Sequence, residues 1–209
     1  MIVAICAGGP LSEVAFSLKP DIWIGVDRGA IYLVDEAIVP NAIVGDFDSV
    51  SAEEFARISK AVQHIEQFQA EKDETDTDLA LEKALGYAPT EIWLTGVTGG
   101  RLDHYEAVLR SVYHLQQQHP NIVIKIVNPY NEIQFLMPGQ HVIRKGNYSY
   151  VSFFAYGQTL VNVTLRGVKY ETTDEVIKQG TTRFTSNEIL SEGSISFLGG
   201  ICLMIKSRD

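Results

Sequence analysis

This sequence has little cysteine, no surplus of positive charge and no long apolar run. Its two cysteines, Cys6 and Cys202, lie near opposite ends of the 209 residues, a spacing that fits neither a zinc knuckle nor a disulfide framework. They favour buried thiols in a reducing, cytoplasmic compartment. A net charge of −9 argues against a protein that grips nucleic acid or an anionic membrane. No run is long enough to span a bilayer, and the first residues predict a strand rather than a signal peptide.

The first 127 residues alternate short apolar runs with segments of helical spacing. Runs rich in Ile and Val predict buried strands over residues 2–7, 22–26, 42–44, 92–95 and 122–127. Helical spacing predicts helices over residues 29–37, 79–85 and 105–118, and Ser51-Ala-Glu-Glu54 has the pattern of a capping box. This alternation predicts an α/β domain over residues 1–127, with a doubly wound, mostly parallel sheet.

The pattern changes after residue 127. Residues 148–155 and 161–165 predict strands, and residues 194–198 and 201–205 predict two more, joined as a hairpin by Gly199-Gly200. Because no convincing helical segment follows, residues 128–209 are predicted to form a small antiparallel β-sandwich domain.

Carboxylates gather at two predicted strand ends. Asp46 and Asp48 directly follow the strand over residues 42–44, and Asp73 and Asp76 precede the helix over residues 79–85. Residues two apart in extended chain point to the same side, so Asp46 and Asp48 can converge. Two such charges about 4 Å apart repel by about 4 kcal/mol at an effective dielectric constant of about 20. Either one aspartate stays protonated or a cation lies between them.

Mg²⁺ suits this arrangement, because it prefers oxygen ligands and takes one or two carboxylates together with substrate phosphates. The sequence therefore predicts a metal site built from Asp46, Asp48, Asp73 and Asp76. For Asp76 and Asp78 a helix-start role is an equal alternative, since carboxylates are favourable at a helix N-terminus.

A third segment, Gly96 to His104, follows the strand over residues 92–95. Its glycines, Gly99 among them, allow close approach of the backbone to a ligand, and Arg101 can bind a phosphate through two hydrogen bonds. Asp103 either adds a carboxylate or caps the next helix, and His104 is either a base or structural. The segment does not match the P-loop pattern G-x-x-x-x-G-K-[ST]. Asp27, after the second strand, either contacts the nucleotide or belongs to a turn.

These stretches resemble the thiamine pyrophosphokinase family. The resemblance rests on Val44-Gly-Asp-Phe-Asp-Ser49, on Lys72 to Leu81 and on Gly96 to His104, and it continues in Gly167-Val-Lys-Tyr170 and Thr185-Ser-Asn-Glu188. It implies Mg²⁺-dependent transfer of diphosphate from ATP to the hydroxyl of thiamine, giving thiamine diphosphate and AMP. It also implies a homodimer whose active sites are shared between subunits.

The resemblance also implies roles for residues. The catalytic residues would be Asp46, Asp48, Asp73, Asp76, Arg101 and Asp103. We expect nucleotide contacts from Asp27, Lys72, Gly99, Arg101 and His104, and thiamine contacts from Tyr170, Ser186 and Asn187. Either Asp46 or Asp73 would take the proton of the hydroxyl.

Three other functions compete with this one. A diphosphokinase for another hydroxymethyl heterocycle, such as a pterin, would carry the same aspartates and differ in the second domain. A non-catalytic sensor of nucleotide or thiamine would have no need of metal-assisted phosphate chemistry. A phosphohydrolase would not need a second domain for an organic substrate.

Overall fold

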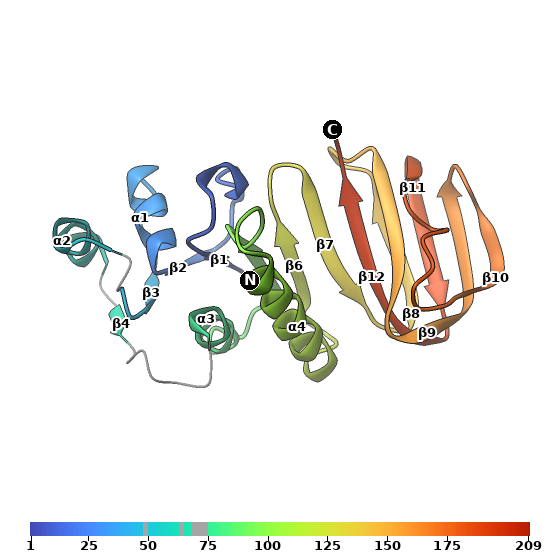
Figure 1. The fold of residues 1–209 in the computed structure, drawn as a ribbon, viewed down its shortest axis with the longest axis horizontal. Helices are drawn as coiled ribbons and strands as arrows, with labels where there is room; N and C mark the ends of the chain where they lie inside the picture. Colours follow the sequence, from blue (N-terminus) through green and yellow to red (C-terminus); the bar gives the residue numbers. More distant parts are fainter. Residues whose placement is uncertain (48–49, 63–64, 68–74) are drawn as a thin grey trace. The chain divides into compact units, whose positions relative to one another are not determined.

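The computed structural model describes residues 1–47, 50–62, 65–67 and 75–209. The predicted site residues Asp48, Lys72 and Asp73 lie outside this described part. The chain divides into two compact units, Met1–Pro129 and Tyr130–Asp209 (Figure 1). The division falls two residues after the boundary predicted between residues 127 and 128.

A parallel sheet forms the centre of the first unit. Its strands follow the order β4-β3-β2-β1-β5-β6, and every neighbouring pair is parallel. They are β1 (Ile2–Cys6), β2 (Ile22–Val26), β3 (Ala42–Gly45), β4 (Ile65–Gln67), β5 (Glu91–Thr95) and β6 (Val123–Val127). The chain order reverses between β1 and β5, and ligands of open α/β sheets bind at the carboxyl ends of strands at such a point.

Helices lie on both sides of this sheet. They are the short 3₁₀ helix η1 (Leu11–Glu13), α1 (Arg28–Asp35), α2 (Ala52–Ala61), α3 (Asp76–Leu85) and α4 (Leu102–Gln118). Figure 1 shows α1 and α2 on one side and α3 and α4 on the other. The predicted α/β fold with a mostly parallel sheet is therefore observed in this unit.

Capping boxes set the starts of two helices. Ser51 Oγ accepts from the Glu54 N–H at 3.2 Å, and Glu54 Oε2 accepts from the Ser51 N–H at 2.9 Å, which confirms the box predicted for α2. Thr75 and Asp78 form an equivalent box at the start of α3. Each box satisfies two backbone donors that a helix start would otherwise leave without partners.

Apolar side chains pack between the sheet and its helices. Ile43 of β3 and Ile58 of α2 are fully buried in one cluster with Ala30 of α1, while Cys6 and Leu33 are fully buried in another. Burial raises the pKa of the Cys6 thiol to about 12 and that of Cys202 to about 12. Both cysteines are thus buried free thiols, as predicted. Among the described helices, none is both long enough and apolar enough to cross a membrane.

The second unit is built from strands, and all of its residues are described. They are β7 (Asn131–Leu136), β8 (Gly139–Arg144), β9 (Tyr150–Val168), β10 (Thr172–Ile177), β11 (Asn187–Phe197) and β12 (Gly199–Ser207). β12 pairs antiparallel with β7 and β9, β10 pairs antiparallel with β9, and β8 pairs antiparallel with β11. Their core contains the fully buried Phe153, Leu165 and Ile195.

The structure corrects two predictions in this unit. The strands predicted over residues 148–155 and 161–165 are parts of one strand, β9, whose first part pairs with β12 and whose second part pairs with β10. The predicted hairpin at Gly199-Gly200 is wrong, because among the described strands β11 and β12 are not neighbours. Gly199 pairs with Val161 of β9 instead. Gly200 has a φ of +86°, and a Cβ there would lie 2.6 Å from the Thr159 carbonyl oxygen, so the glycine marks a close backbone approach.

Candidate active site

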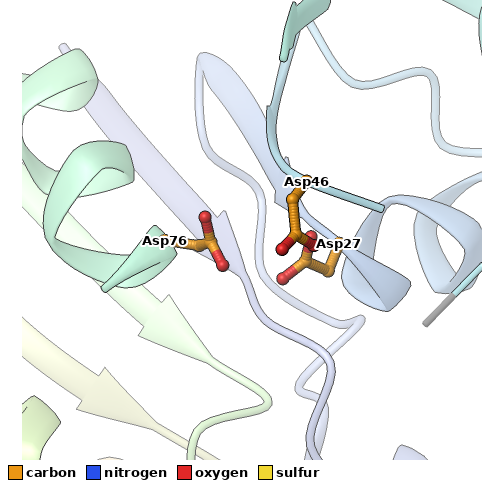
Figure 2. Close-up of side chains that lie close together, drawn as sticks. All are labelled: Asp27, Asp46 and Asp76. Carbon is orange, nitrogen blue, oxygen red and sulfur yellow. The ribbon is translucent and has the colours of Figure 1, made fainter. Parts of the chain in front are cut away.

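Three carboxylates meet at the carboxyl ends of the parallel strands. Asp27 follows β2, Asp46 follows β3, and Asp76 is the first residue of α3. One oxygen of each lies within 4.8 Å of the others, and all three side chains are half-buried. Figure 2 shows the carboxylates of Asp27 and Asp46 directed towards that of Asp76. The structure thus brings together Asp46 and Asp76, which the sequence predicted, and adds Asp27 as a third carboxylate.

An unusual backbone conformation and two hydrogen bonds hold Asp27 in the cluster. Asp27 has a φ of 46°, its N–H donates to the Val44 carbonyl at 3.1 Å, and its Oδ1 accepts from the Phe47 N–H at 3.3 Å. A Cβ on Gly45 would lie 1.9 Å from Asp27 Oδ1. Only glycine therefore lets the end of β3 pass so close to this carboxylate.

The three carboxylates of the cluster lie close together, so the negative charge of each opposes the ionisation of the others. Burial, together with the carboxylates of Asp76 and Asp46, raises the pKa of Asp27 to about 7, while the hydrogen bond from the Phe47 N–H opposes the shift. A group with this pKa is partly protonated near neutral pH, so Asp27 can share a hydrogen bond with Asp76. A bound cation would instead favour the charged form of all three carboxylates.

The start of α3 separates the roles of Asp76 and Asp78. Asp78 Oδ2 accepts from Thr75 N–H at 3.1 Å and from Thr75 Oγ1 at 2.7 Å, which makes it a capping residue. Asp76 directs its carboxylate into the cluster. The helix-start alternative is thus correct for Asp78, whereas the metal role of Asp76 stays a prediction that its place in the cluster supports.

A cleft of about 470 Å³ lies beside the cluster. Its walls come from residues 7–10 after β1, residues 26–28 from the end of β2 to the start of α1, residues 75–77 at the start of α3, the loop between β5 and α4, and the first two turns of α4. It therefore opens where the strand order reverses between β1 and β5. Asp27 and Asp76 line it, so the carboxylates stand at its edge. Its volume is in the range of small-molecule sites.

The segment between β5 and α4 forms a loop along this cleft. Gly96 and Gly99 have φ values of +70° and +75°, and the Gly9 N–H donates to the Gly96 carbonyl at 2.8 Å. Arg101 and His104 line the cleft. Gly99 is not among the described residues that line it, and its predicted contact with a nucleotide stays a prediction.

Asp103 lies with Arg101 rather than with the clustered carboxylates. Its two oxygens accept from Arg101 Nε at 3.1 Å and from Arg101 Nη2 at 2.6 Å, and both side chains are exposed. The hydrogen bonds from Arg101 lower the pKa of Asp103 to about 2. Asp103 Oδ1 also accepts from the His104 N–H at 3.0 Å. Asp103 therefore orients Arg101 and the start of α4.

The predicted thiamine contacts lie on two segments of the second unit, the connection between β9 and β10 and the start of β11. Tyr170 is 62% exposed, and its N–H donates to Asn187 Oδ1 while its carbonyl accepts from Asn187 Nδ2, each at 2.9 Å. Asn187 is buried, so it shapes the turn that presents Tyr170. Ser186 is exposed with a φ of +57°, and its N–H donates to Ser152 Oγ at 2.9 Å.

Sequence reasoning missed two parts of the first unit's site. Asp27 has the same place after β2 as Asp46 has after β3, and that repeated strand-end position was the signal for its membership of the cluster. Glu13 and Asn128 bind Thr98 in the loop beside the cleft, and nothing in their spacing along the chain announces this contact.

A parallel sheet with carboxylates and a glycine-containing loop at its switch point is the architecture of α/β enzymes that handle phosphates. Two family models match this chain. The model described as thiamin pyrophosphokinase, catalytic domain, matches residues 16–124, and the model described as thiamin pyrophosphokinase, vitamin B1 binding domain, matches residues 140–202.

Relatives agree over the whole length. The thiamine pyrophosphokinase of Bacillus subtilis (strain 168) is 39% identical, with 99% of each chain covered. The crystal structure of thiamine pyrophosphokinase from Bacillus subtilis aligns with a TM-score of 0.92 at 38% identity over 100% of both chains. That of a thiamin pyrophosphokinase family protein from Enterococcus faecalis aligns with a TM-score of 0.89 at 32% identity, covering 100% of this chain and 99% of the other. The chain belongs to the thiamine pyrophosphokinase family, and it is an enzyme, as the sequence predicted.

Proposed function

We propose that the chain transfers diphosphate from ATP to the hydroxyl of thiamine in a Mg²⁺-dependent reaction, with AMP as the second product. The observation that carries this proposal is the meeting of Asp27, Asp46 and Asp76 at the edge of the cleft, in a chain whose family is thiamine pyrophosphokinase. Such a cluster is costly in a protein that has no positive ion or group to place there.

The donor set fits Mg²⁺. Asp27, Asp46 and Asp76 offer oxygen atoms only, and their mutual distances are compatible with one ion contacted by more than one of them. When bound, the ion neutralises charge that develops on the transferred phosphates. The predicted ligands Asp48 and Asp73 belong to the same proposal.

The cleft suits the nucleotide. Its loop carries Arg101, whose guanidinium can leave Asp103 for a phosphate or bind both, and the N-terminus of α4 faces the same loop. A helix N-terminus and backbone N–H groups favour anions. The residues of the chain would thus orient the triphosphate between this loop and the carboxylates, so that the α–β bond lies near Asp46 and Asp76.

The acceptor is proposed from the second unit. Its match to the vitamin B1 binding domain favours thiamine over a pterin, and the exposed ring of Tyr170 offers a face for the cationic thiazolium. The hydroxyl oxygen attacks the β-phosphorus, the bond to the α-phosphate breaks, and AMP leaves. Asp46 is the described candidate for taking the hydroxyl proton. We infer further a cytoplasmic homodimer with shared active sites.

Mass-spectrometric analysis of products tests the proposal. The chain is incubated with ATP and thiamine, with and without Mg²⁺, and a parallel reaction contains a hydroxymethylpterin in place of thiamine. We expect equal amounts of thiamine diphosphate and AMP, only with Mg²⁺. A pterin diphosphate would support the pterin diphosphokinase instead. ADP and phosphate without any acceptor product would indicate a hydrolase, and binding without turnover would indicate a sensor.

A further inference from the structure

A polar network joins the two loops on either side of the switch point. Thr98, in the loop after β5, donates through Oγ1 to Glu13 Oε2 at 2.6 Å. Asn128, just after β6, donates through Nδ2 to the same Glu13 oxygen at 2.8 Å and to Thr98 Oγ1 at 2.9 Å. One carboxylate oxygen of Glu13 therefore holds side chains from two other segments of the first unit.

The segment that carries Glu13 is also bonded to β5 through its backbone groups. Thr95, fully buried at the end of β5, accepts through Oγ1 from the Ala15 N–H at 2.7 Å and donates to the Glu13 carbonyl at 3.4 Å. The segment that carries Glu13 is thus fixed to β5 itself. The backbone of Glu13 is therefore held in place, and the Glu13 side chain extends from it to the loop.

Glu13 also determines the shape of the loop by contact. A Cβ on Gly99 would lie 2.5 Å from Glu13 Cγ and 2.8 Å from its Cδ, so the loop backbone packs directly on this side chain. Asn128 is buried, which makes loss of its hydrogen bonds costly. Thr98 lines the cleft, whereas Glu13 is not among the described residues that do so. An effect of Glu13 on a ligand in the cleft would therefore act through Thr98 and the backbone conformation of the loop.

We propose that Glu13 is a positioning residue, which holds the loop of residues 96–101 in the conformation that binds the phosphates of ATP. The inference rests on the proposed function for the identity of the nucleotide. A carboxylate beside a site for a polyanion is unfavourable in Coulomb energy alone, and its two hydrogen-bond donors offset this cost. Removal of the charge by itself would strengthen ATP binding, while loss of the loop conformation would weaken it.

Three variants distinguish these effects. Glu13→Leu keeps the approximate size and removes the acceptor, whereas Glu13→Gln keeps an oxygen that can accept from Thr98 and Asn128. Glu36→Leu, at an exposed carboxylate after α1, removes one negative charge elsewhere. The measurements are KM for ATP, KM for thiamine, kcat, Tm, and the Kd of α,β-methylene-ATP with Mg²⁺ in the absence of thiamine. In this analogue the bond that the proposed reaction cleaves cannot break.

We expect Glu13→Leu to raise KM for ATP and the Kd of the analogue about tenfold, the effect of roughly one hydrogen bond to a charged group. KM for thiamine should not change, and Glu13→Gln and Glu36→Leu should stay within about threefold of the unsubstituted protein. If Glu13→Leu lowers Tm or kcat but leaves the Kd of the analogue unchanged, Glu13 is merely structural and the proposal is wrong.

A further variant tests the proposal if Glu13→Leu does not fold. Thr98→Val keeps the shape and removes the hydroxyl that Glu13 binds, and it should raise the Kd of the analogue in the same direction. An unchanged Kd would overturn the proposal. If the unsubstituted protein forms no thiamine diphosphate, the proposed function fails, but the Kd of the analogue still decides whether Glu13 positions the loop.

Discussion

In the first unit three carboxylates are directed at one another, whereas in the second unit the side-chain amide of Asn187 is bonded to the backbone of Tyr170. Asp27 responds to its neighbours with a pKa raised to about 7 by burial and by the charges of Asp76 and Asp46. Asn187 instead donates to the Tyr170 carbonyl and accepts from the Tyr170 N–H, so its hydrogen bonds are satisfied within the fold.

Under the proposed function, this difference separates the groups that take part in the reaction from the groups that shape a binding surface. Crowded like charges lower the stability of a fold and are retained where a ligand offsets the repulsion. A buried amide with satisfied hydrogen bonds stabilises a turn and presents an exposed neighbour, here Tyr170. Substitutions in the two regions should therefore affect different quantities, namely rate and metal dependence in the first and affinity for the acceptor in the second.

The largest effect is expected at the carboxylates. Asp46→Asn and Asp76→Asn each remove one charge with almost no change of shape, and we expect each to lower kcat by about 100-fold or more because metal and phosphate charges lose a partner. Tm should stay the same or rise, since the repulsion in the cluster decreases. Steady-state kinetics with thiamine and ATP, together with thermal melting, measure both.

Asp35→Asn is the matched control for these two variants. Asp35 lies at the end of α1, is half exposed and pairs with Arg57 on the surface. An exposed pair contributes about 0–1 kcal/mol, so activity and Tm should hardly change. Rates near normal in both Asp46→Asn and Asp76→Asn would contradict the metal assignment and remove the contrast between the two units.

The strands of the first unit could be read from the sequence because each is a short run of buried apolar residues. All five predicted strands agree with the observed ones to within one residue at either end. The missed strand, β4, stands at the end of the order of the described strands, has only three residues, Ile-Glu-Gln, and carries almost no apolar signal. Local pattern thus determined the strands that are buried on both faces.

The site was only partly accessible to the same reasoning. The position after a strand identified Asp46, and the same argument applied to β2 would have placed Asp27 beside it. The sequence predicts phosphate or metal handling for Asp103, which pairs with Arg101 in the structure, and that role stays a prediction. Glu13 and Thr98 are 85 residues apart in sequence, and only the tertiary fold brings them within hydrogen-bond distance.

The second unit shows why β topology is harder to derive. Gly199-Gly200 predicted a hairpin, but a glycine pair does not specify which strands become neighbours, and β11 and β12 are not neighbours among the described strands. β9 was divided into two strands because its pattern is interrupted near Gly157, which has a φ of +74°. Pairing depends on distant partners, so local sequence fixed neither the length of β9 nor the partners of β12.

At Asp27 we expect a smaller effect, a change in Tm whose sign differs between the presence and the absence of Mg²⁺. Saturating Mg²⁺ should raise the Tm of the unsubstituted protein by about 5 °C through preferential binding to the folded state. Asp27→Asn keeps an oxygen for the Phe47 N–H and removes a charge, so without Mg²⁺ its Tm should be slightly higher. With Mg²⁺ its gain should be less than half as large.

Thermal melting in a chelator and in a series of Mg²⁺ concentrations gives both signs, and Ca²⁺ in place of Mg²⁺ tests the preference for the ion. Equal shifts for Asp27→Asn and the unsubstituted protein would mean that the ion binds elsewhere. The three carboxylates would then destabilise the fold without binding an ion, and their difference from Asn187 would not reflect a difference in function.

The smallest effect is expected at Asn187. Asn187→Ala leaves the backbone groups of Tyr170 without their partner, which costs about 1–3 kcal/mol and loosens the turn. We expect KM for thiamine to rise by about threefold to tenfold with kcat and KM for ATP nearly unchanged. Asn41→Ala is the matched control, because Asn41 Oδ1 accepts from the Trp23 N–H at 2.9 Å in the first unit. Both variants should lower Tm, but only Asn187→Ala should change KM for thiamine. If neither variant changes KM for thiamine, the turn that presents Tyr170 is structural, and thiamine binds through other residues.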